Sequence, residues 1–141
     1  MEICFVCYGN ICRSVMAEYM MKKMAADRGR KDISCFSRAA SSHTEGMDIY
    51  GLAKKCLDRH GIPYSRHQAH KITEEDYRRS DRIYVMDEDN VWTLERLLED
   101  TEGKISMLLE TEIADPWYTG DFETTYKDLK RGIENILEEY L

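Results

Sequence analysis

The sequence predicts one α/β domain in which helices cover both faces of a parallel sheet. Short β-rich apolar runs alternate along the chain with stretches whose apolar residues recur at helical spacing. This alternation favours a parallel sheet, because parallel strands are joined by crossover helices. The chain has 141 residues and no internal repeat or linker, which is enough for a single core. We therefore expect residues 1–141 to form one domain.

The first strand and the first helix are the most clearly marked elements. The run from Ile3 to Val6 is apolar without alternation, as in a strand buried on both faces. Ser14 can then cap a helix whose apolar positions fall at helical spacing: Val15, Met16, Tyr19, Met20 and Met24. In full, the pattern predicts strands 2–7, 33–38, 82–86 and 104–108 and helices 14–28, 48–60, 74–78, 88–99 and 122–140.

Composition narrows the classes of function. A net charge of −7 at pH 7 argues against nucleic acid and anionic membranes as partners. The longest stretch without a charged residue, Ile3 to Cys12, is far too short to span a membrane, and no signal peptide is visible. Five cysteines without the spacing of a disulfide scaffold favour a reducing cytoplasm over secretion.

The segment from Cys7 to Ser14, Cys-Tyr-Gly-Asn-Ile-Cys-Arg-Ser, carries the chemistry. It lies between a strand and a helix N-terminus, where backbone N–H groups and the helix dipole attract anions. The same environment ionises Cys7, and the planar fork of Arg13 matches two phosphate oxygens. Gly9 permits backbone angles closed to other residues, and Asn10 tolerates the left-handed region. The segment predicts a site that cleaves a phosphate ester.

A second motif, Asp115-Pro116-Trp117-Tyr118, supplies what such a cleavage still needs. One carboxyl group, that of Asp115, can protonate the leaving group and then activate water. Pro116 forces Asp115 out of helical geometry, which suits a projecting loop carboxyl. The two aromatic residues can form flat walls for a phenyl ring. Taken alone, the motif favours a turn that is followed by core aromatics, but next to an intact phosphate loop it favours catalysis.

With both motifs, the chain resembles the low-molecular-weight protein tyrosine phosphatases. Their signatures are Cys-x-Gly-Asn-x-Cys-Arg-Ser near the N-terminus and Asp-Pro-aromatic-aromatic near the C-terminus, and the likeness runs from about Ile3 to the final helix. The resemblance implies a four-stranded parallel sheet in the order 2-1-3-4, with the phosphate-binding loop after strand 1. It also implies tyrosine-phosphorylated proteins as substrates, catalysis without metal or other cofactor, and, we expect, a monomer.

The resemblance further implies roles for individual residues. Cys7 attacks phosphorus, Arg13 and the amides of residues 8 to 13 hold the phosphate oxygens, and Asp115 is the general acid and base. Ser14 is expected to hydrogen-bond the Cys7 sulfur as it departs from phosphorus. Substrate contacts are expected from one set of residues: Tyr8, Gly9, Asn10, Ile11, Cys12, Ser14, Trp117, Tyr118 and, at the pocket entrance, His43. Asn10 paired with Ser37, and His67 behind the loop, are expected as structural support, and Asp87 resembles an aspartate that supports the site.

The sequence leaves open the role of Cys12, in the first motif, and the effect of Val15, in the helix that follows it. Cys12 is either a small buried apolar residue or the partner of Cys7 in a reversible disulfide that protects the nucleophile. Val15 stands where the family usually has proline, which is pre-organised for a first helical turn. We expect this replacement to lower stability without removing a catalytic group.

Four other functions compete with this hypothesis. Arsenate reductases of this fold relay electrons through two later cysteines, whereas this sequence has none after Cys56. Phosphoarginine phosphatases characteristically carry threonine where this chain has Ile11, whose bulk favours an aryl phosphate. A phosphotyrosine-binding module without turnover and a flavodoxin-like nucleotide binder are disfavoured by the intact Cys7, Arg13 and Asp115. Cys4 and Cys7 form a Cys-x-x-Cys, but Cys4 lies inside the strand and no further ligands complete a metal site, nor do the histidines show metal spacing.

Overall fold

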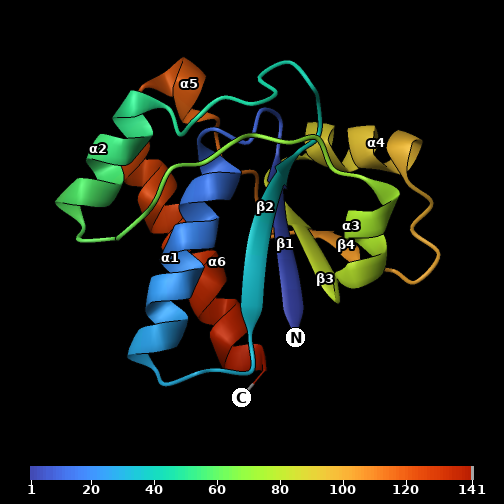
Figure 1. Ribbon diagram of the computed structural model, residues 1–141, viewed down its shortest axis with the longest axis horizontal. Coiled ribbons are helices and arrows are strands. Elements are labelled where there is room, and N and C mark those ends of the chain that lie inside the picture. Colours follow the sequence, from blue (N-terminus) through green and yellow to red (C-terminus); the bar gives the residue numbers. More distant parts are fainter. Residues whose placement is uncertain (141) are drawn as a thin grey trace.

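A twisted parallel sheet forms the centre of the computed structural model, which describes residues 1–140 (Figure 1). Within these residues its strands are β1 (Glu2–Cys7), β2 (Ser34–Ala39), β3 (Arg82–Val85) and β4 (Ile105–Met107). Every pairing is parallel and the spatial order is β2-β1-β3-β4. The predicted fold class and strand order are therefore confirmed.

Helices cover both faces of this sheet. They are α1 (Arg13–Asp27), α2 (Gly51–Arg59), α3 (Glu74–Arg79), α4 (Glu88–Leu97), α5 (Pro116–Thr119) and α6 (Phe122–Glu139). Figure 1 shows α1, α2 and α6 on one side of the sheet and α3 and α4 on the other. Between residues 1 and 140, no helix is long and apolar enough to cross a membrane.

The pleat of β1 divides the apolar residues between two cores. Ile3, Phe5 and Cys7 point to the core shared with α1, α2 and α6, whereas Cys4 and Val6 point to the core under α3 and α4. All five side chains are buried, as the run of apolar residues without alternation predicts. Cys4 and Cys7 consequently lie on opposite faces of the sheet, so they do not act as one Cys-x-x-Cys pair.

The helix starts differ from the predicted ones in two places. The helix predicted over 14–28 begins at Arg13, with Cys12 at the N-cap position and no side-chain cap, so the capping role of Ser14 is wrong. The helix predicted over 48–60 begins at Gly51, because Asp48 instead binds the backbone N–H groups of Ile49 and His67. The other boundaries agree with the prediction to within two residues.

The short helix α5 was not predicted. Asp115 caps it by accepting a hydrogen bond from the N–H of Trp117 at 3.0 Å, and Pro116 occupies its first position. Gly120 ends it with φ 72°, in the left-handed region. Four residues are too few to show a helical period, which is why periodicity missed it.

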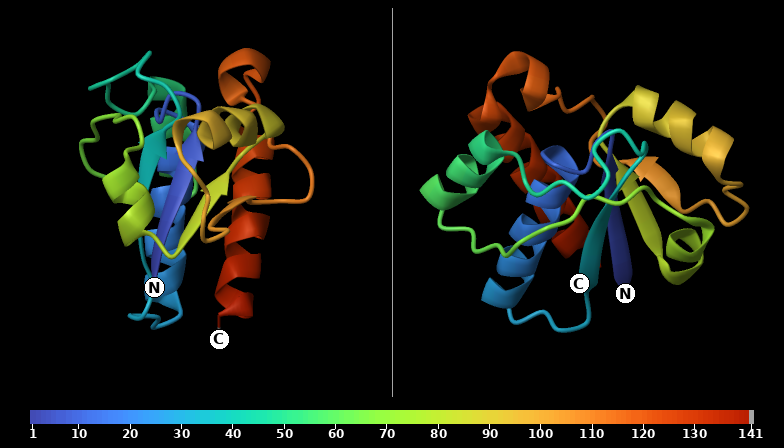
Figure 2. Two further views of the ribbon diagram at one scale, coloured as in Figure 1. Left: turned by 90° about the vertical axis from the view of Figure 1, so that its right-hand side faces the viewer. Right: turned by 45° about the horizontal axis from the view of Figure 1, so that its top comes forward.

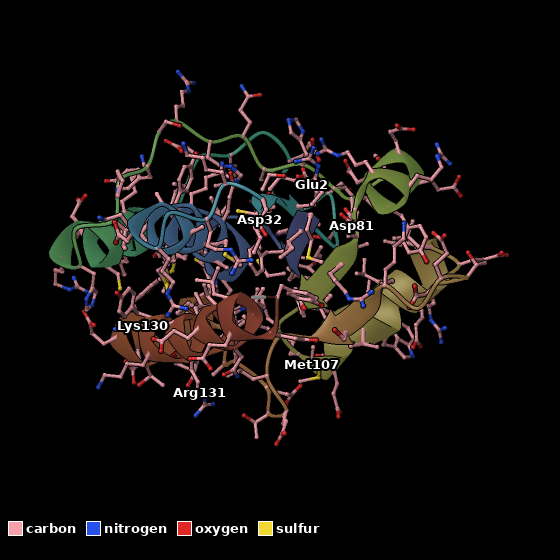
Figure 3. All side chains as sticks on the ribbon, turned by 90° about the horizontal axis from the view of Figure 1, so that it is seen from below. Glu2, Asp32, Asp81, Met107, Lys130 and Arg131 are labelled. Carbon is pink, nitrogen blue, oxygen red and sulfur yellow. The ribbon has the colours of Figure 1, made fainter. Side chains whose placement is uncertain are left out.

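The two ends of the sheet differ in what surrounds them. The carboxyl ends of the strands lead into the loops that face the viewer in the right-hand panel of Figure 2, where α4 and α5 also lie. The opposite end is seen from below in Figure 3, with Glu2, Asp32 and Asp81 close together near the strand starts. The order β2-β1-β3-β4 means that successive strands are added on one side of β1 and then on the other, so the strand order reverses between β1 and β3. Ligands in such sheets bind outside the carboxyl ends of the strands at that point.

Candidate active site

Cys7 is the last residue of β1 and lies almost fully buried in the wall of a cavity of about 420 Å³. The backbone N–H of Ser14 donates to its Sγ at 3.4 Å, and the Ser14 Oγ lies 3.1 Å from the same sulfur. Ser14, which lies in the first turn of α1, thus brings two hydrogen-bonding groups to the sulfur of Cys7.

The loop between β1 and α1 holds its shape through Asn10. This residue has φ 60°, in the left-handed region that asparagine tolerates better than most residues. Its buried side-chain amide donates to Ser14 Oγ at 2.8 Å and to Ser37 Oγ at 3.0 Å. The pairing with Ser37 is the one that the resemblance implied, and the second bond connects the loop to the hydroxyl beside Cys7.

Gly9 is needed for a different reason from the one predicted. Its φ does not lie in the left-handed region, so the predicted backbone role is wrong. A Cβ at this position would instead approach Thr44 Oγ1 to 2.9 Å. Thr44 donates a hydrogen bond to the Gly9 carbonyl at 2.5 Å, so glycine lets the loop after β2 pack directly on the loop after β1.

A second layer of residues supports Asn10 from behind. Ser37 donates to the carboxylate of the buried Glu18 at 2.6 Å, and that carboxylate also binds the Nζ of Lys22. His67 Nε2 lies 2.8 Å from the carbonyl oxygen of Asn10. Burial lowers the pKa of His67 although the hydrogen bond to the Asn10 carbonyl acts in the opposite direction.

Arg13 is the central cation of the site. It is only 2% exposed, and its Nη1 donates to Asp87 Oδ2 at 2.7 Å and to the carbonyl of Ile113 at 2.8 Å. Its Nε is buried and has no hydrogen-bond partner within residues 1–140. Burial lowers the pKa of Arg13, but nearby Cys7 and the hydrogen bond to Asp87 outweigh it, so the pKa lies above its ordinary value. The side chain is therefore a fixed cation, and of its nitrogen atoms only Nε has no partner within residues 1–140.

Asp115 faces the Arg13 guanidinium from the loop after β4. Its Oδ2 lies 3.5 Å from Arg13 Nη2, while Oδ1 caps α5. The backbone at Asp115 is extended, as expected for a residue before proline. Asp115 does start a helical turn, but the aromatic residues after it are exposed and line the cavity, so the alternative that they are core residues is wrong.

Aromatic side chains surround the mouth of the cavity. Trp117 packs against Tyr50 with ring centroids 4.7 Å apart, and Tyr118 is 84% exposed. Tyr8 lies beside His43, with ring centroids 6.3 Å apart. All except Tyr50 line the cavity, which gives it flat apolar walls.

The remaining predicted residues also lie at the cavity or behind it. Ile11 and Cys12 line it, and both are buried. Burial, followed by the charge of nearby Cys7, raises the pKa of the Cys12 thiol, so Cys12 stays protonated where a nucleophile needs to be ionised. Val15 is fully buried in the core under α1.

Several contributors were not predicted: Glu18, Thr44, Met47, Tyr50 and the carbonyl of Ile113. Four of them reach the site from distant parts of the chain, and no spacing rule connects them to the loop at 7–14: Thr44, Met47, Tyr50 and Ile113. Glu18 lies nearby on α1 and acts through Ser37. The carboxyl ends of the strands bring the site together, because Cys7 ends β1 and the segments after β2, β3 and β4 supply Thr44, Asp87 and Asp115 respectively.

Folding also brings together one group of possible metal ligands away from this site. The ligand atoms of Cys56, His60 and Glu123 lie within 4.8 Å of one another, although the sequence showed no metal spacing for the histidines. Glu123 already pairs with His60 Nε2 at 2.6 Å and with Arg59 Nε at 2.8 Å. We interpret these contacts as polar interactions that hold the end of α2 against α6.

Fold and site together define a class of protein: a parallel α/β domain with a cysteine and an arginine in a phosphate-binding loop at a helix N-terminus. The family model of the low molecular weight phosphotyrosine protein phosphatases matches residues 2–141. The chain belongs to this family, as its resemblance implied.

Individual relatives agree with this assignment. A low molecular weight protein-tyrosine-phosphatase PtpA of Staphylococcus aureus is 32% identical over 143 residues, covering 97% of this chain and 92% of its own. The structure of SP-PTP, a low molecular weight protein tyrosine phosphatase from Streptococcus pyogenes, superposes with a TM-score of 0.92 at 35% identity, covering 99% of this chain and 93% of that one. DARP, a Drosophila arginine phosphatase, superposes with a TM-score of 0.90 at 27% identity, covering 99% of this chain and 98% of the DARP chain.

Proposed function

We propose that this protein hydrolyses phosphotyrosine monoesters through a phosphocysteine intermediate on Cys7. The observation that carries the proposal is the guanidinium of Arg13, which is buried beside Cys7 with an Nε that has no protein partner within residues 1–140. A buried donor without a partner is costly unless a ligand binds it. The Nε and Nη2 edge matches two oxygens of a phosphate, because Nη1 is already bound to Asp87 and Ile113.

In the first step the Cys7 thiolate attacks phosphorus, and the bond between phosphorus and the phenolic oxygen breaks. Arg13 and the loop amides of residues 8–13 hold the three other oxygens as negative charge redistributes. Asp115 donates its proton to the departing phenolate, which leaves as a neutral phenol. The tyrosine ring fits between the aromatic rims of the cavity, with Tyr8 on one side and Trp117 and Tyr118 on the other.

The second step releases phosphate. The Asp115 carboxylate takes a proton from a water molecule, which attacks phosphorus as the bond to sulfur breaks. Ser14 stabilises the departing thiolate through the contacts described above, at 3.1 and 3.4 Å. Phosphate leaves, and Asp115 is again protonated for the next substrate. The steps use only groups of this chain.

Phosphoarginine is the second candidate substrate, since an arginine phosphatase shares the fold over nearly its whole length. Ile11 lines the cavity where the phosphoarginine phosphatases characteristically carry threonine. An apolar side chain there offers no partner for a phosphoguanidinium, whose N–H groups need acceptors. This supports phosphotyrosine as the preferred substrate.

We also propose that the enzyme works in the cytoplasm, as a monomer, and that oxidation can join Cys7 to Cys12. All five cysteines are free and buried in the structure, and the chemistry needs a reduced Cys7. Cys7 and Cys12 line the same cavity. Peroxide-treated enzyme should contain this disulfide, and a thiol should restore activity; oxidation of Cys7 without a bond to Cys12 would contradict the redox role.

The test of the function measures hydrolysis of p-nitrophenyl phosphate in the presence of EDTA, with and without vanadate. The wild type should be active and sensitive to vanadate, and Cys7→Ser inactive although it still binds phosphate. Competing phosphotyrosine and phosphoarginine peptides then separate the two candidate substrates. No activity in folded, reduced wild type would favour the binding module instead.

A further inference from the structure

A second hollow continues from the catalytic cavity towards α4. It measures about 480 Å³ and shares four lining residues with the catalytic cavity: Tyr8, Arg13, Asp115 and Tyr118. Its other wall comes from the start of α4 and includes Asp89, Trp92 and Thr93. The right-hand panel of Figure 2 shows α4 on the side of the β1–α1 loop that lies away from α2. We call this hollow the α4 groove.

The position of the α4 groove suits a substrate residue next to the phosphotyrosine. When the tyrosine ring fills the catalytic cavity, the substrate backbone must lie at its mouth, between Tyr8 and Tyr118. Adjacent residues of a peptide have Cα atoms only about 3.8 Å apart. A neighbouring side chain can therefore reach the groove directly across the shared rim.

Asp89 is the charged residue of the α4 groove that substrate can reach most readily. The one cation among its lining residues within 1–140 is Arg13, which is 2% exposed and paired with Asp87 and Asp115. Asp89 is exposed and forms no ion pair with any of the described residues. A cation of the substrate would complement Asp89, whereas a substrate carboxylate would be repelled.

Trp92 adds a flat apolar surface of suitable chemistry. It is 57% exposed although it is a large aromatic residue. The guanidinium of Arg96 already lies 3.6 Å from the centre of its ring, so this ring attracts a guanidinium within the protein itself. The long stem of a substrate arginine or lysine can pack along the indole while its charged end reaches Asp89.

We propose that the α4 groove selects phosphotyrosine sites that have arginine or lysine directly beside the phosphotyrosine, and disfavours those with aspartate or glutamate there. Asp89 and Trp92 are the specificity residues. This inference rests on the proposed phosphotyrosine phosphatase activity and names its substrate class.

The test compares kcat/KM for phosphotyrosine peptides that differ at one position. Arginine, glutamine or glutamate stands immediately before the phosphotyrosine in one set and immediately after it in a second set. In at least one set the wild type should favour arginine over glutamate by about two- to fivefold, the size expected for an exposed ion pair, and less at high salt. In the Asp89→Asn variant the ratio of kcat/KM for the arginine peptide to that for the glutamate peptide should fall towards one. The Trp92→Ala variant should lower this ratio as well.

Glu95→Gln is the matched control, because Glu95 is an exposed carboxylate on α4 that lines a different hollow. It should leave the arginine-to-glutamate ratio unchanged. Equal rates for all peptides in wild type, or an equal fall of the ratio in Glu95→Gln, would overturn the proposal. Hydrolysis of p-nitrophenyl phosphate by the wild type is measured in parallel: if it persists when the peptide preference is absent, only the groove proposal fails, and if it is absent, the proposed function fails first.

Discussion

The two ends of the sheet hold arginine and aspartate in opposite ways. At the carboxyl end, Arg13 is buried with an Nε that no group within residues 1–140 binds, and Asp115 faces it across an open cavity. At the amino end, Arg30 binds both carboxylate oxygens of Asp32 at 2.9 Å and also the carbonyls of Leu137 and Tyr140. Figure 3 shows this second end, with Asp32 near Asp81 and Glu2.

This difference separates a site from a scaffold. The groups of the amino end are satisfied by the protein: Asp81 accepts from the N–H of Glu2 at 2.7 Å, and the N-terminal amine donates to the carbonyl of Asp32. At the carboxyl end the loop holds Asn10 in the left-handed region, and Arg13, whose Nε has no partner within residues 1–140, lines a cavity. Donors left for a ligand cost stability, and the fold concentrates them where substrate binds.

The largest expected effect is that of Asp115→Asn. Asparagine can still cap α5, so the fold should persist, but it cannot donate or accept the catalytic proton. Turnover of substrates with poor leaving groups should fall by about 10²- to 10⁴-fold, and less for good leaving groups. Steady-state kinetics with a series of aryl phosphates measures this; equal losses across the series would contradict the role of Asp115 as the acid. Asp81→Asn, at the other end of the sheet, is the control and should not change the rate.

Next in size is Arg13→Lys, compared with Arg30→Lys. Lysine keeps the charge but loses the planar fork, so Arg13→Lys should lower kcat by about 10²- to 10³-fold. Arg30→Lys should leave kcat unchanged and lower the melting temperature slightly, since its groups act on the scaffold alone. Comparable losses of activity in both variants would remove the distinction between the two ends.

Asn10 allows backbone strain and hydrogen bonding to be separated. Asn10→Ala loses the bonds to Ser14 and Ser37 and also places alanine in the left-handed region, whereas Asn10→Gly loses only the bonds. Both should lower kcat about tenfold, because the Ser14 hydroxyl loses its orientation. Alanine should be less stable than glycine by about 1–2 kcal/mol, as denaturant unfolding would show. Equal stability would mean that the loop is not strained.

The smallest effect concerns pH and His67. Burial lowers the folded-state pKa of His67 below its ordinary value of 6.5, so the unfolded chain binds the proton more tightly. The contribution of this residue to stability is therefore present above about pH 6.5 and declines as the pH falls from there towards the folded pKa. Unfolding measured from pH 8 to 5 should show a weaker pH dependence in His67→Gln than in wild type. If the pH dependence of unfolding is the same in His67→Gln as in wild type, groups other than His67 cause it.

Much of this arrangement can be predicted from the sequence, for reasons that are local. The strand, the loop and the helix from residue 2 to residue 27 are contiguous, so the apolar run and the Cys-to-Ser segment predict the phosphate loop without long-range information. The left-handed conformation of Asn10 follows from residue type. Topology then brings the ends of the other strands to the same edge.

What the sequence did not predict depends on contacts between distant segments. Thr44 determines why position 9 is glycine, and Glu18 holds Ser37, yet neither is marked by spacing. For Ser14 the sequence predicted both a helix cap and a hydrogen bond to the Cys7 sulfur; the cap is wrong because the helix starts one residue earlier, whereas the hydroxyl does lie 3.1 Å from that sulfur. Local preference was overridden at the point where the chemistry is located, as is expected of a functional site.

The most direct test of the account is to identify the residue that carries the phosphoryl group during turnover. Wild-type enzyme and Cys7→Ser are mixed with p-nitrophenyl phosphate, quenched rapidly in acid, digested and examined by mass spectrometry. The account predicts one added phosphoryl group on the wild-type peptide that contains Cys7, and none in Cys7→Ser, which should also lack turnover. Turnover that persists in Cys7→Ser, or a phosphoryl group on another residue, would contradict it.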